Sequence, residues 1–172
     1  SVKFNILGNS VILEACRKSA IKRFIFASSL YVYSKAGSFY RSTKQSSELL
    51  IENYHEVFGL KYTILRYGSL YGPRADSRNF IHNILTQAVS KGKIIREGDG
   101  EELREYIHVY DAARSSIAAL SEEFINQHVI ITGNQQMKVK DLLAMIREMM
   151  DNKIEIEYTN SDPAYHYEIT PY

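Results

Sequence analysis

The sequence contains a single cysteine, Cys16, no tryptophan, and only three prolines among its 172 residues. One thiol cannot form an intramolecular disulfide, so no disulfide framework is expected, and Cys16 is predicted to be a small buried hydrophobe. No apolar run is long enough to span a membrane. Together these features favour a protein of the reducing cytoplasm without a membrane partner.

A strong charge of either sign is also lacking, because the formal net charge is +1. This balance, with thirteen dispersed tyrosines and no tryptophan, disfavours nucleic acid as a partner. The five histidines are scattered without HxxH or CxxC spacing, so no metal site is expected. Neither a GxSxG nucleophile elbow nor a P-loop occurs in the sequence.

Segments typical of strands and helices alternate along the chain. Residues 23–29 (RFIFASS) and 61–67 (KYTILRY) are short apolar runs typical of buried parallel strands. Residues 45–58 between them carry apolar side chains at helical spacing, and Gly59 is a C-cap signal. Strand, helix, strand in this order predicts a right-handed crossover, so the expected fold class is α/β with a parallel sheet. Further helices or strands are predicted at 79–89, 112–120, 128–134, 139–150 and 153–158.

Tyr40 and Lys44 lie four residues apart at the start of the predicted helix, so their side chains share one helix face. The preceding strand ends in Ser28 and Ser29, at the sheet edge where ligands of parallel sheets bind. A lysine cation lowers the pKa of a nearby tyrosine, which can then act as a base, while a serine hydroxyl can hold the reacting oxygen. A solvated helix face explains the same spacing, so the pair alone leaves both interpretations open.

The order of these residues resembles the extended short-chain dehydrogenase/reductase family of nucleotide-sugar epimerases and dehydratases. That family has a Ser/Thr–Tyr–Lys site of the form YxxxK, here Tyr40 to Lys44. Its catalytic hydroxyl lies four residues before the tyrosine of V-Y-G, here Ser29 before Tyr33, with Ser34 replacing the glycine. The resemblance implies a partial Rossmann-like, doubly wound parallel sheet with a small α/β substrate-binding portion. It also implies Ser29, Tyr40 and Lys44 as the catalytic residues.

Two further segments resemble parts of the same family, and one of them bears on a cofactor. Residues 5–15 resemble the family's N-x-x-G-T…L-E-A helix, and residues 65–74 (LRYGSLYGPR) resemble its L-R-x-x-N-x-Y-G-P loop, which wraps the nicotinamide. Ser69 stands where the family has asparagine. The resemblance implies NAD or NADP as cofactor, with NAD favoured. The implied cofactor contacts are Ser28, Tyr40, Lys44, Tyr67, Gly68 and Ser69.

Residues 98–111 (GDGEELREYIHVYD) are similar to the family's G-D-G-x-x-x-R-[DE]-[YF]-I-[HY]-V-x-D. There the arginine grips the substrate pyrophosphate, which implies this role for Arg104; a solvated surface charge is the alternative. Asn79, before Phe-Ile, resembles the family asparagine that contacts the diphosphate, and a helix N-cap is its other interpretation. Tyr31 is the third implied substrate contact. Asp111 is expected to start the next helix as an N-cap or first-turn acid.

The family's Gly-rich turn, G-x-x-G-x-x-G, does not occur in this sequence. We therefore expect an incomplete chain, with more sequence before it and after it in the family. The predicted organisation is one incomplete domain over residues 1–172. Residues 1–73 and 105–136 would form its nucleotide-binding part, and residues 74–104 and 137–172 its substrate-binding part.

The residues after Ser29 bear on the reaction. In the family's 4,6-dehydratases and sugar-acid decarboxylases, acidic residues follow the catalytic hydroxyl, whereas here Leu30 and Tyr31 follow Ser29. This difference favours a 4-epimerase, an isomerase in which Tyr40 is the base and hydride moves transiently to the nicotinamide. A reductase of 4-keto sugars or a dehydratase is the alternative, and a non-catalytic nucleotide-binding relative or a small interaction module also remains open.

Members of this family commonly pair through the helix that carries YxxxK and the helix before it. A homodimer through this helix is therefore expected. Leu13, Leu49 and Tyr54 are candidates for the interface, although packing in the core explains them equally well.

Overall fold

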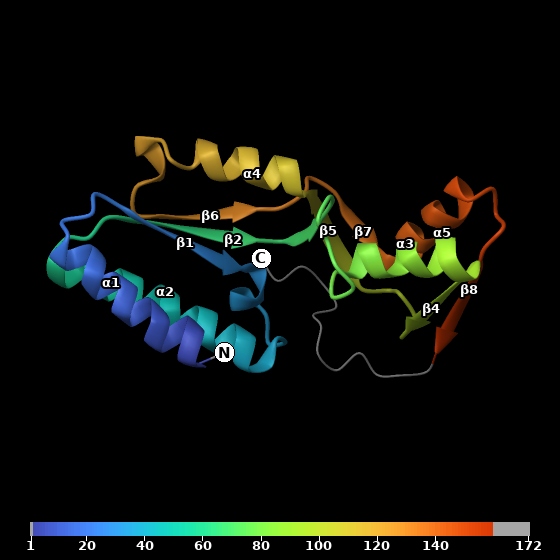
Figure 1. The fold of residues 1–172 in the computed structure, drawn as a ribbon, viewed down its shortest axis with the longest axis horizontal. Coiled ribbons are helices and arrows are strands. Elements are labelled where there is room, and N and C mark those ends of the chain that lie inside the picture. The colour runs from blue at the N-terminus through green and yellow to red at the C-terminus, as the bar shows by residue number, and fades with distance from the viewer. Residues whose placement is uncertain (1, 160–172) are drawn as a thin grey trace.

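The computed structural model describes residues 2–159 of the chain as two groups of elements side by side (Figure 1). The first group holds the larger part of the N-terminal half. Its elements are η1 (Lys3–Gly8), α1 (Asn9–Lys18), β1 (Phe24–Ser29), η2 (Leu30–Tyr33), α2 (Ser38–Phe58), β2 (Tyr62–Tyr67), α4 (Val109–Ala118), η3 (Glu122–Phe124) and β6 (Gln127–Ile131).

The remaining elements form the second group and the strands that lead to it. They are β3 (Ser69–Tyr71), α3 (Phe80–Lys91), β4 (Lys93–Glu97), β5 (Leu103–His108), β7 (Gln136–Lys138), α5 (Val139–Met149) and β8 (Glu155–Thr159). Within residues 2–159, no helix is both long and apolar enough to cross a membrane.

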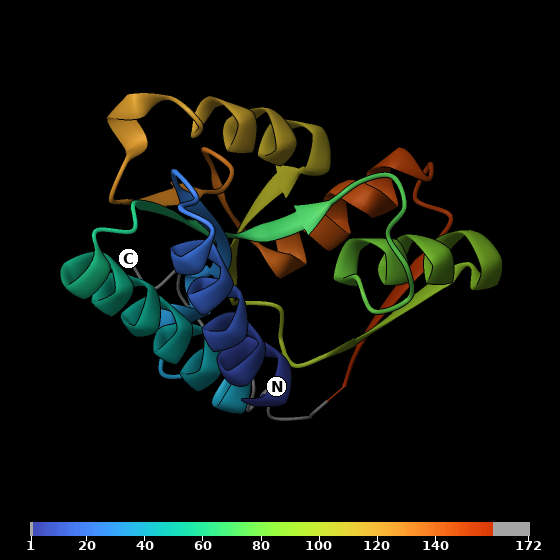
Figure 2. The same cartoon turned by 60° about the vertical axis from the view of Figure 1, so that its left-hand side comes forward.

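The first group is a parallel sheet between helices. Its strand order is β1-β2-β6, and both pairings are parallel. Helices α1 and α2 cover one face and α4 the other, as Figures 1 and 2 show. The predicted α/β class with a parallel, doubly wound sheet is therefore confirmed. In the register, Ser28 lies beside Arg66 and Ser29 beside Tyr67, so the two serines reach the carboxyl edge of the sheet.

Neighbouring residues of β2 pack into different cores because successive strand side chains point to opposite faces. Ile64 lies in the core under α1 and α2, with Leu13, Phe26 and Ile51. Leu65 lies in the core under α4, and the other buried members of that cluster are Ile107, Ala112, Ala119 and Ile131. Burial on both faces explains why β2 reads as a continuous apolar run rather than an alternating one.

The second group is built on the parallel pair β4-β8, with α3 and α5 packed against it. Its core is a separate cluster that includes Ile84, Ile94, Leu143 and Ile154. Between the two groups, β5 pairs with β3 in parallel and with β7 in antiparallel orientation. The division into nucleotide-binding and substrate-binding parts stays a prediction, and residues 160–172 of the second part lie outside the described residues.

Two glycines allow close backbone approach where the two groups join. A Cβ at Gly133 would clash with the carbonyl oxygen of Tyr106, and one at Gly68 would clash with the Thr132 side chain. The Gly68 amide donates a hydrogen bond to the Ile131 carbonyl at 2.9 Å. These contacts place the start of β3 and the middle of β5 just beyond the carboxyl edge of β2.

The structure corrects several sequence-based predictions. Helix α4 begins at Val109 rather than near 112, because His108 is the N-cap: its Nδ1 accepts from the Tyr110 amide at 3.3 Å. Asp111 lies in the first turn of α4, which confirms the second of its two predicted roles, that of a first-turn acid. Leu13 is fully buried under the sheet, so its assignment to a dimer interface is wrong. Cys16 is half-buried against the same core cluster.

Candidate active site

The chain turns sharply between the end of β1 and the start of α2. Ser29 is buried and accepts a hydrogen bond from the Tyr31 amide at 3.3 Å, which caps the short helix η2. Gly37 then precedes α2 with a φ of +92°, and a Cβ there would press on the Tyr31 ring. The Tyr31 ring meets the Tyr40 ring edge-on, with centroids 6.0 Å apart. This turn therefore places the Tyr31 ring directly beside Tyr40, the predicted base.

Lys44 reaches from α2 to the end of β1. Its Nζ donates to the Ala27 carbonyl at 2.7 Å and lies 4.7 Å from the centroid of the Phe26 ring. The same nitrogen is 5.9 Å from the centroid of the Tyr40 ring. Burial lowers the pKa of the Lys44 amine below its ordinary value, and the nearby Glu48 carboxylate opposes this shift.

Tyr40 is 45% exposed, so its phenol is open to a ligand rather than sealed in the core. The three predicted catalytic residues come from the end of β1 and the first two turns of α2. Ser29, Tyr40 and Lys44 therefore lie around one turn of the chain. Their assignment as a catalytic set stays a prediction.

A buried ionic network lies directly behind this turn. Glu48, 5% exposed, takes two hydrogen bonds from Arg66, with Nε–Oε1 at 3.1 Å and Nη2–Oε2 at 2.6 Å. Ser28 Oγ donates to the same carboxylate at 2.5 Å. Arg66 Nη1 donates to the Tyr33 hydroxyl, and the guanidinium lies 4.6 Å from that ring's centroid. The Ser28 hydroxyl, predicted to contact a cofactor, is thus hydrogen-bonded within the protein.

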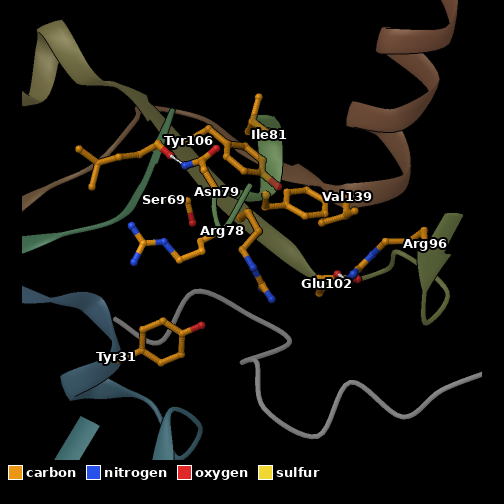
Figure 3. A pocket seen from close by; sticks show the side chains of 12 residues that line it. Tyr31, Ser69, Arg78, Asn79, Ile81, Arg96, Glu102, Tyr106 and Val139 are labelled. Carbon is orange, nitrogen blue, oxygen red and sulfur yellow. Dashed lines mark hydrogen bonds and ion pairs between the residues drawn. The ribbon is translucent and has the colours of Figure 1, made fainter. Parts of the chain in front are cut away.

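A pocket of about 240 Å3 opens next to this region (Figure 3). Four of the predicted site residues line it, Tyr31, Ser69, Asn79 and Arg104, and Figure 3 shows Tyr31 across the pocket from Ser69 and Asn79. The other lining residues are Leu70, Arg78, Phe80, Ile81, Arg96, Glu102, Tyr106 and Val139. The fold thus brings together predicted site residues that lie as far as 73 positions apart, from Tyr31 to Arg104.

Asn79 is the N-cap of α3, which confirms that interpretation of the residue. Its Oδ1 accepts from the His82 amide at 3.1 Å, and its Nδ2 donates to the Leu70 carbonyl at 2.8 Å. The side chain is therefore fixed at the start of a helix whose N-terminal end carries partial positive charge. Arg104 lies on β5, is only 8% exposed, and donates from Nη1 to the Leu103 carbonyl at 2.8 Å.

Positive charge predominates in the pocket. Arg78, Arg96 and Arg104 contribute three guanidinium groups, and the one acidic side chain among the lining residues, Glu102, is paired with Arg96. Arg78 also forms an exposed ion pair with Asp76 at 2.6 Å. A planar guanidinium donates paired hydrogen bonds to phosphate oxygens, so this pocket is chemically suited to a phosphorylated ligand.

Sequence reasoning missed most of the pocket's lining. Glu102 and Tyr106 alternate with Arg104 along the chain, so period-two spacing would have placed them on the same face of the strand. Arg78 directly precedes Asn79 and could have been included for that reason. Arg96 gave no such signal, because it lies on β4, a different strand from the β5 strand that carries Arg104.

Tyr67 and Gly68, predicted to contact a cofactor, lie where β2 ends. The Tyr67 hydroxyl is 2.6 Å from Ser116 Oγ of α4, so its side chain lies on the α4 face of the sheet. Gly68 presents its amide to Ile131. Their contacts with a cofactor stay a prediction.

Comparisons with known proteins give a consistent result. The model of the NAD dependent epimerase/dehydratase family matches residues 2–132. The chain is 28% identical over 169 residues to "Uncharacterized UDP-glucose epimerase YtcB" of Bacillus subtilis, covering 91% of this chain and 54% of that protein. It is 26% identical to UDP-glucuronate 4-epimerase of Thermodesulfobacterium geofontis, covering 92% and 53%. The chain thus spans about half the length of these curated relatives.

Solved structures show the same relationship. UDP-glucuronic acid 4-epimerase from Bacillus cereus, in complex with UDP-glucuronic acid and NAD, has a TM-score of 0.87 at 28% identity, covering 98% of this chain and 58% of that one. UDP-glucose 4-epimerase from Thermotoga maritima, with UDP-glucose, has a TM-score of 0.86 at 28% identity, covering 98% and 60%. The similarity confirms the predicted Rossmann-like fold.

Proposed function

The chain belongs to the NAD-dependent epimerase/dehydratase family, and from this membership we propose that the protein containing it is a nucleotide-sugar 4-epimerase that uses NAD. One observation above all supports this proposal. Tyr31 lines the arginine-rich pocket and also packs edge-on against Tyr40. One side chain therefore contacts both the proposed phosphate-binding pocket and the candidate base. The activity of the whole protein is inferred, since the chain spans about half of its curated relatives.

The proposed chemistry uses three side chains. Tyr40, as phenolate, takes the proton from a sugar hydroxyl, and the Lys44 cation stabilises that phenolate. Ser29 holds the reacting oxygen. A bound NAD would supply the hydride acceptor and donor, and Tyr40 would return its proton to the sugar oxygen when the hydride goes back to the opposite face of the ketosugar.

The residues at the sheet edge suit the nicotinamide end of NAD. Lys44 presents a half-buried ammonium at the end of β1, and a lysine nitrogen can donate further hydrogen bonds to ribose hydroxyls besides the one to Ala27. Parallel sheets bind ligands at this carboxyl edge. We therefore assign Ser28, Tyr40, Lys44 and the segment 67–69 to the cofactor side, with NAD preferred to NADP because the Bacillus cereus structure contains NAD.

The substrate side is the pocket, which Ser69 also lines, so Ser69 would lie where the cofactor and substrate sides meet. Arg104 is proposed to bind the pyrophosphate of a nucleotide-diphosphate sugar, with Asn79 at the start of α3 and Tyr31 opposite. A pyrophosphate matches the excess of guanidinium over carboxylate groups there. The residues after Ser29 favour epimerisation over dehydration, because Leu30 and Tyr31 provide no acid for an elimination.

Product analysis tests the proposal. The protein as its gene encodes it is incubated with NAD and UDP-hexoses, and the sugars are separated after hydrolysis. We expect interconversion of the 4-epimers with no net change in NADH absorbance. Net consumption of NADH with a 4-keto sugar would identify a reductase instead, and loss of water from the sugar would identify a dehydratase.

We further propose a cytoplasmic homodimer that pairs through α1 and α2. Leu7 of η1 and Val11 of α1 lie one turn apart and are exposed, as are Leu49 and Val57, two turns apart on α2. Exposed apolar side chains on adjacent helices support a protein interface. Light scattering should give a mass twice that of one chain, and a monomeric mass would reject the dimer. Cell fractionation would test the compartment, in which the lone thiol of Cys16 would stay reduced.

A further inference from the structure

The buried pair Glu48–Arg66 joins all the segments that carry the proposed catalytic residues. Glu48 lies on α2, one turn after Lys44 and two turns after Tyr40. Arg66 lies on β2, directly beside Ser28 in the register of the sheet. The carboxylate also accepts a hydrogen bond from the Ser28 hydroxyl, and the guanidinium donates one to the hydroxyl of Tyr33 at the end of η2. One carboxylate therefore connects α2, the end of β1, β2 and, through Arg66, η2.

The geometry of this network restricts motion of the turn. The two hydrogen bonds from Arg66 fix the plane of the Glu48 carboxylate, because a planar guanidinium and a carboxylate pair in one orientation. The fixed carboxylate then holds the hydroxyl of Ser28, whose neighbour Ser29 is the N-cap of η2. Since Glu48 is 5% and Ser28 4% exposed, water does not readily replace either partner.

From these contacts we infer that Glu48 is a positioning residue for the reaction, which holds the Ser29 end of β1 against the Tyr40–Lys44 face of α2. This inference rests on the proposed function. Glu48 contacts neither proposed ligand, and it acts through Ser28 and through its charge near Lys44. Arg66 acts one step further away by fixing Glu48.

Glu48 also sets the charge around Lys44. Among the described residues, the titratable groups that face this region are Tyr40 and Glu48 on α2, Arg66 on β2, and Tyr31 and Tyr33 on η2. From β1, Lys44 meets only uncharged groups, the Ala27 carbonyl and the Phe26 ring. Removing the Glu48 charge would leave Arg66 as an unbalanced cation nearby. The pKa of Lys44 would then fall further, because the one carboxylate that raises it is lost.

The test compares Glu48→Gln with Glu52→Gln. Glu52 lies one turn later on the same helix and pairs with His128 of β6 at 3.0 Å, away from the turn, so it is a matched control. In E48Q we expect kcat for epimerisation to fall about tenfold with KM little changed, because the chemistry is misaligned while the pocket remains. The alkaline limb of the kcat profile should move to lower pH. E52Q should match the wild type in all three measurements.

A second variant covers the case in which E48Q does not fold. Ser28→Ala keeps the ion pair and removes only the link to β1, and it should lower kcat without raising KM. The double variant should be no slower than E48Q alone, because both changes break one connection. If E48Q matches E52Q, if KM rises while kcat is unchanged, or if S28A turns over like the wild type, the inference is overturned.

One measurement separates this inference from the proposed function. The Lys44 amine is titrated by NMR on protein labelled with 15N-lysine, which requires no turnover. A lower Lys44 pKa in E48Q than in E52Q supports the role of Glu48 even if the wild type converts no sugar. An unchanged Lys44 pKa in E48Q rejects it even if the epimerase assay succeeds.

Discussion

Tyr40→Phe is expected to lower kcat for sugar interconversion by about a thousandfold, since a positioned acid or base contributes on that order. The substitution removes one hydroxyl and leaves the ring that meets Tyr31. Because Tyr40 is 45% exposed, the core does not depend on its hydroxyl. KM for the nucleotide sugar should change little, since Arg104 and Asn79 stay in place. Initial rates over a range of substrate concentrations measure both quantities.

Tyr54→Phe is the matched control for this experiment. Tyr54 lies on the same helix and directs its hydroxyl to Glu14 Oε2 at 3.5 Å, on the side facing α1. It should keep the wild-type rate. A Y40F enzyme that turns over like Y54F would remove the tyrosine from the mechanism and favour a nucleotide-binding protein over an enzyme.

Lys44→Met is expected to lower kcat at neutral pH by at least about a hundredfold, and to let the rate recover as the pH rises. Without the cation, the charge proposed to stabilise the Tyr40 phenolate is lost, so the base is harder to form near neutral pH. The acid limb of the pH–rate profile therefore moves to higher pH. A profile of kcat from pH 6 to 10 measures this shift.

Stability should change in the opposite sense from activity in this variant. Burial places the Lys44 pKa below its unfolded value of 10.5, so the folded protein bears the cost of a desolvated cation at every pH below that lowered pKa. The cost disappears as the pH rises towards the unfolded pKa. Methionine avoids it, so thermal unfolding of K44M at pH 7 should occur no lower than in the wild type.

Lys44→Arg distinguishes charge from shape. It keeps the cation on a longer side chain, so it should lose less activity than K44M and keep the acid limb near its wild-type position. Equal losses and equal profiles in the two variants would contradict a role for the charge. If K44M unfolds at a much lower temperature than the wild type, loss of structure would instead explain its loss of activity.

The sequence allowed good prediction of elements whose cores are local. β1, α2 and β2 follow each other closely, and their apolar runs and stripes predict the βαβ unit that the structure contains. The turn that collects Ser29, Tyr40 and Lys44 follows from this unit, since all three lie within sixteen consecutive residues. The start of α4 was harder, because a histidine side chain supplies the cap where a carboxylate was expected.

Contacts between distant segments could not be predicted in the same way. The sequence places Glu48 one turn after Lys44 on the predicted helix, but its partner Arg66 follows only from the register of β1 and β2. Likewise, Tyr31 and Arg104 line one pocket although they are 73 positions apart, and no local pattern indicates this. Leu13 shows a further limit: an apolar helical stripe indicates burial but does not tell whether a core or a second subunit buries it.

The glycine contacts between the two groups have a consequence for the placement of the pocket. Gly133 meets the Tyr106 carbonyl, Gly68 meets the Thr132 side chain, and the Gly68–Ile131 hydrogen bond ties the end of β2 to the end of β6. The contact of Gly133 with Tyr106 of β5 leaves no room for a side chain between the end of the sheet and β5, the strand that carries Arg104. A larger residue at position 133 would therefore push β5 away from the sheet edge and shift Arg104 relative to the turn that holds Ser29 and Tyr40.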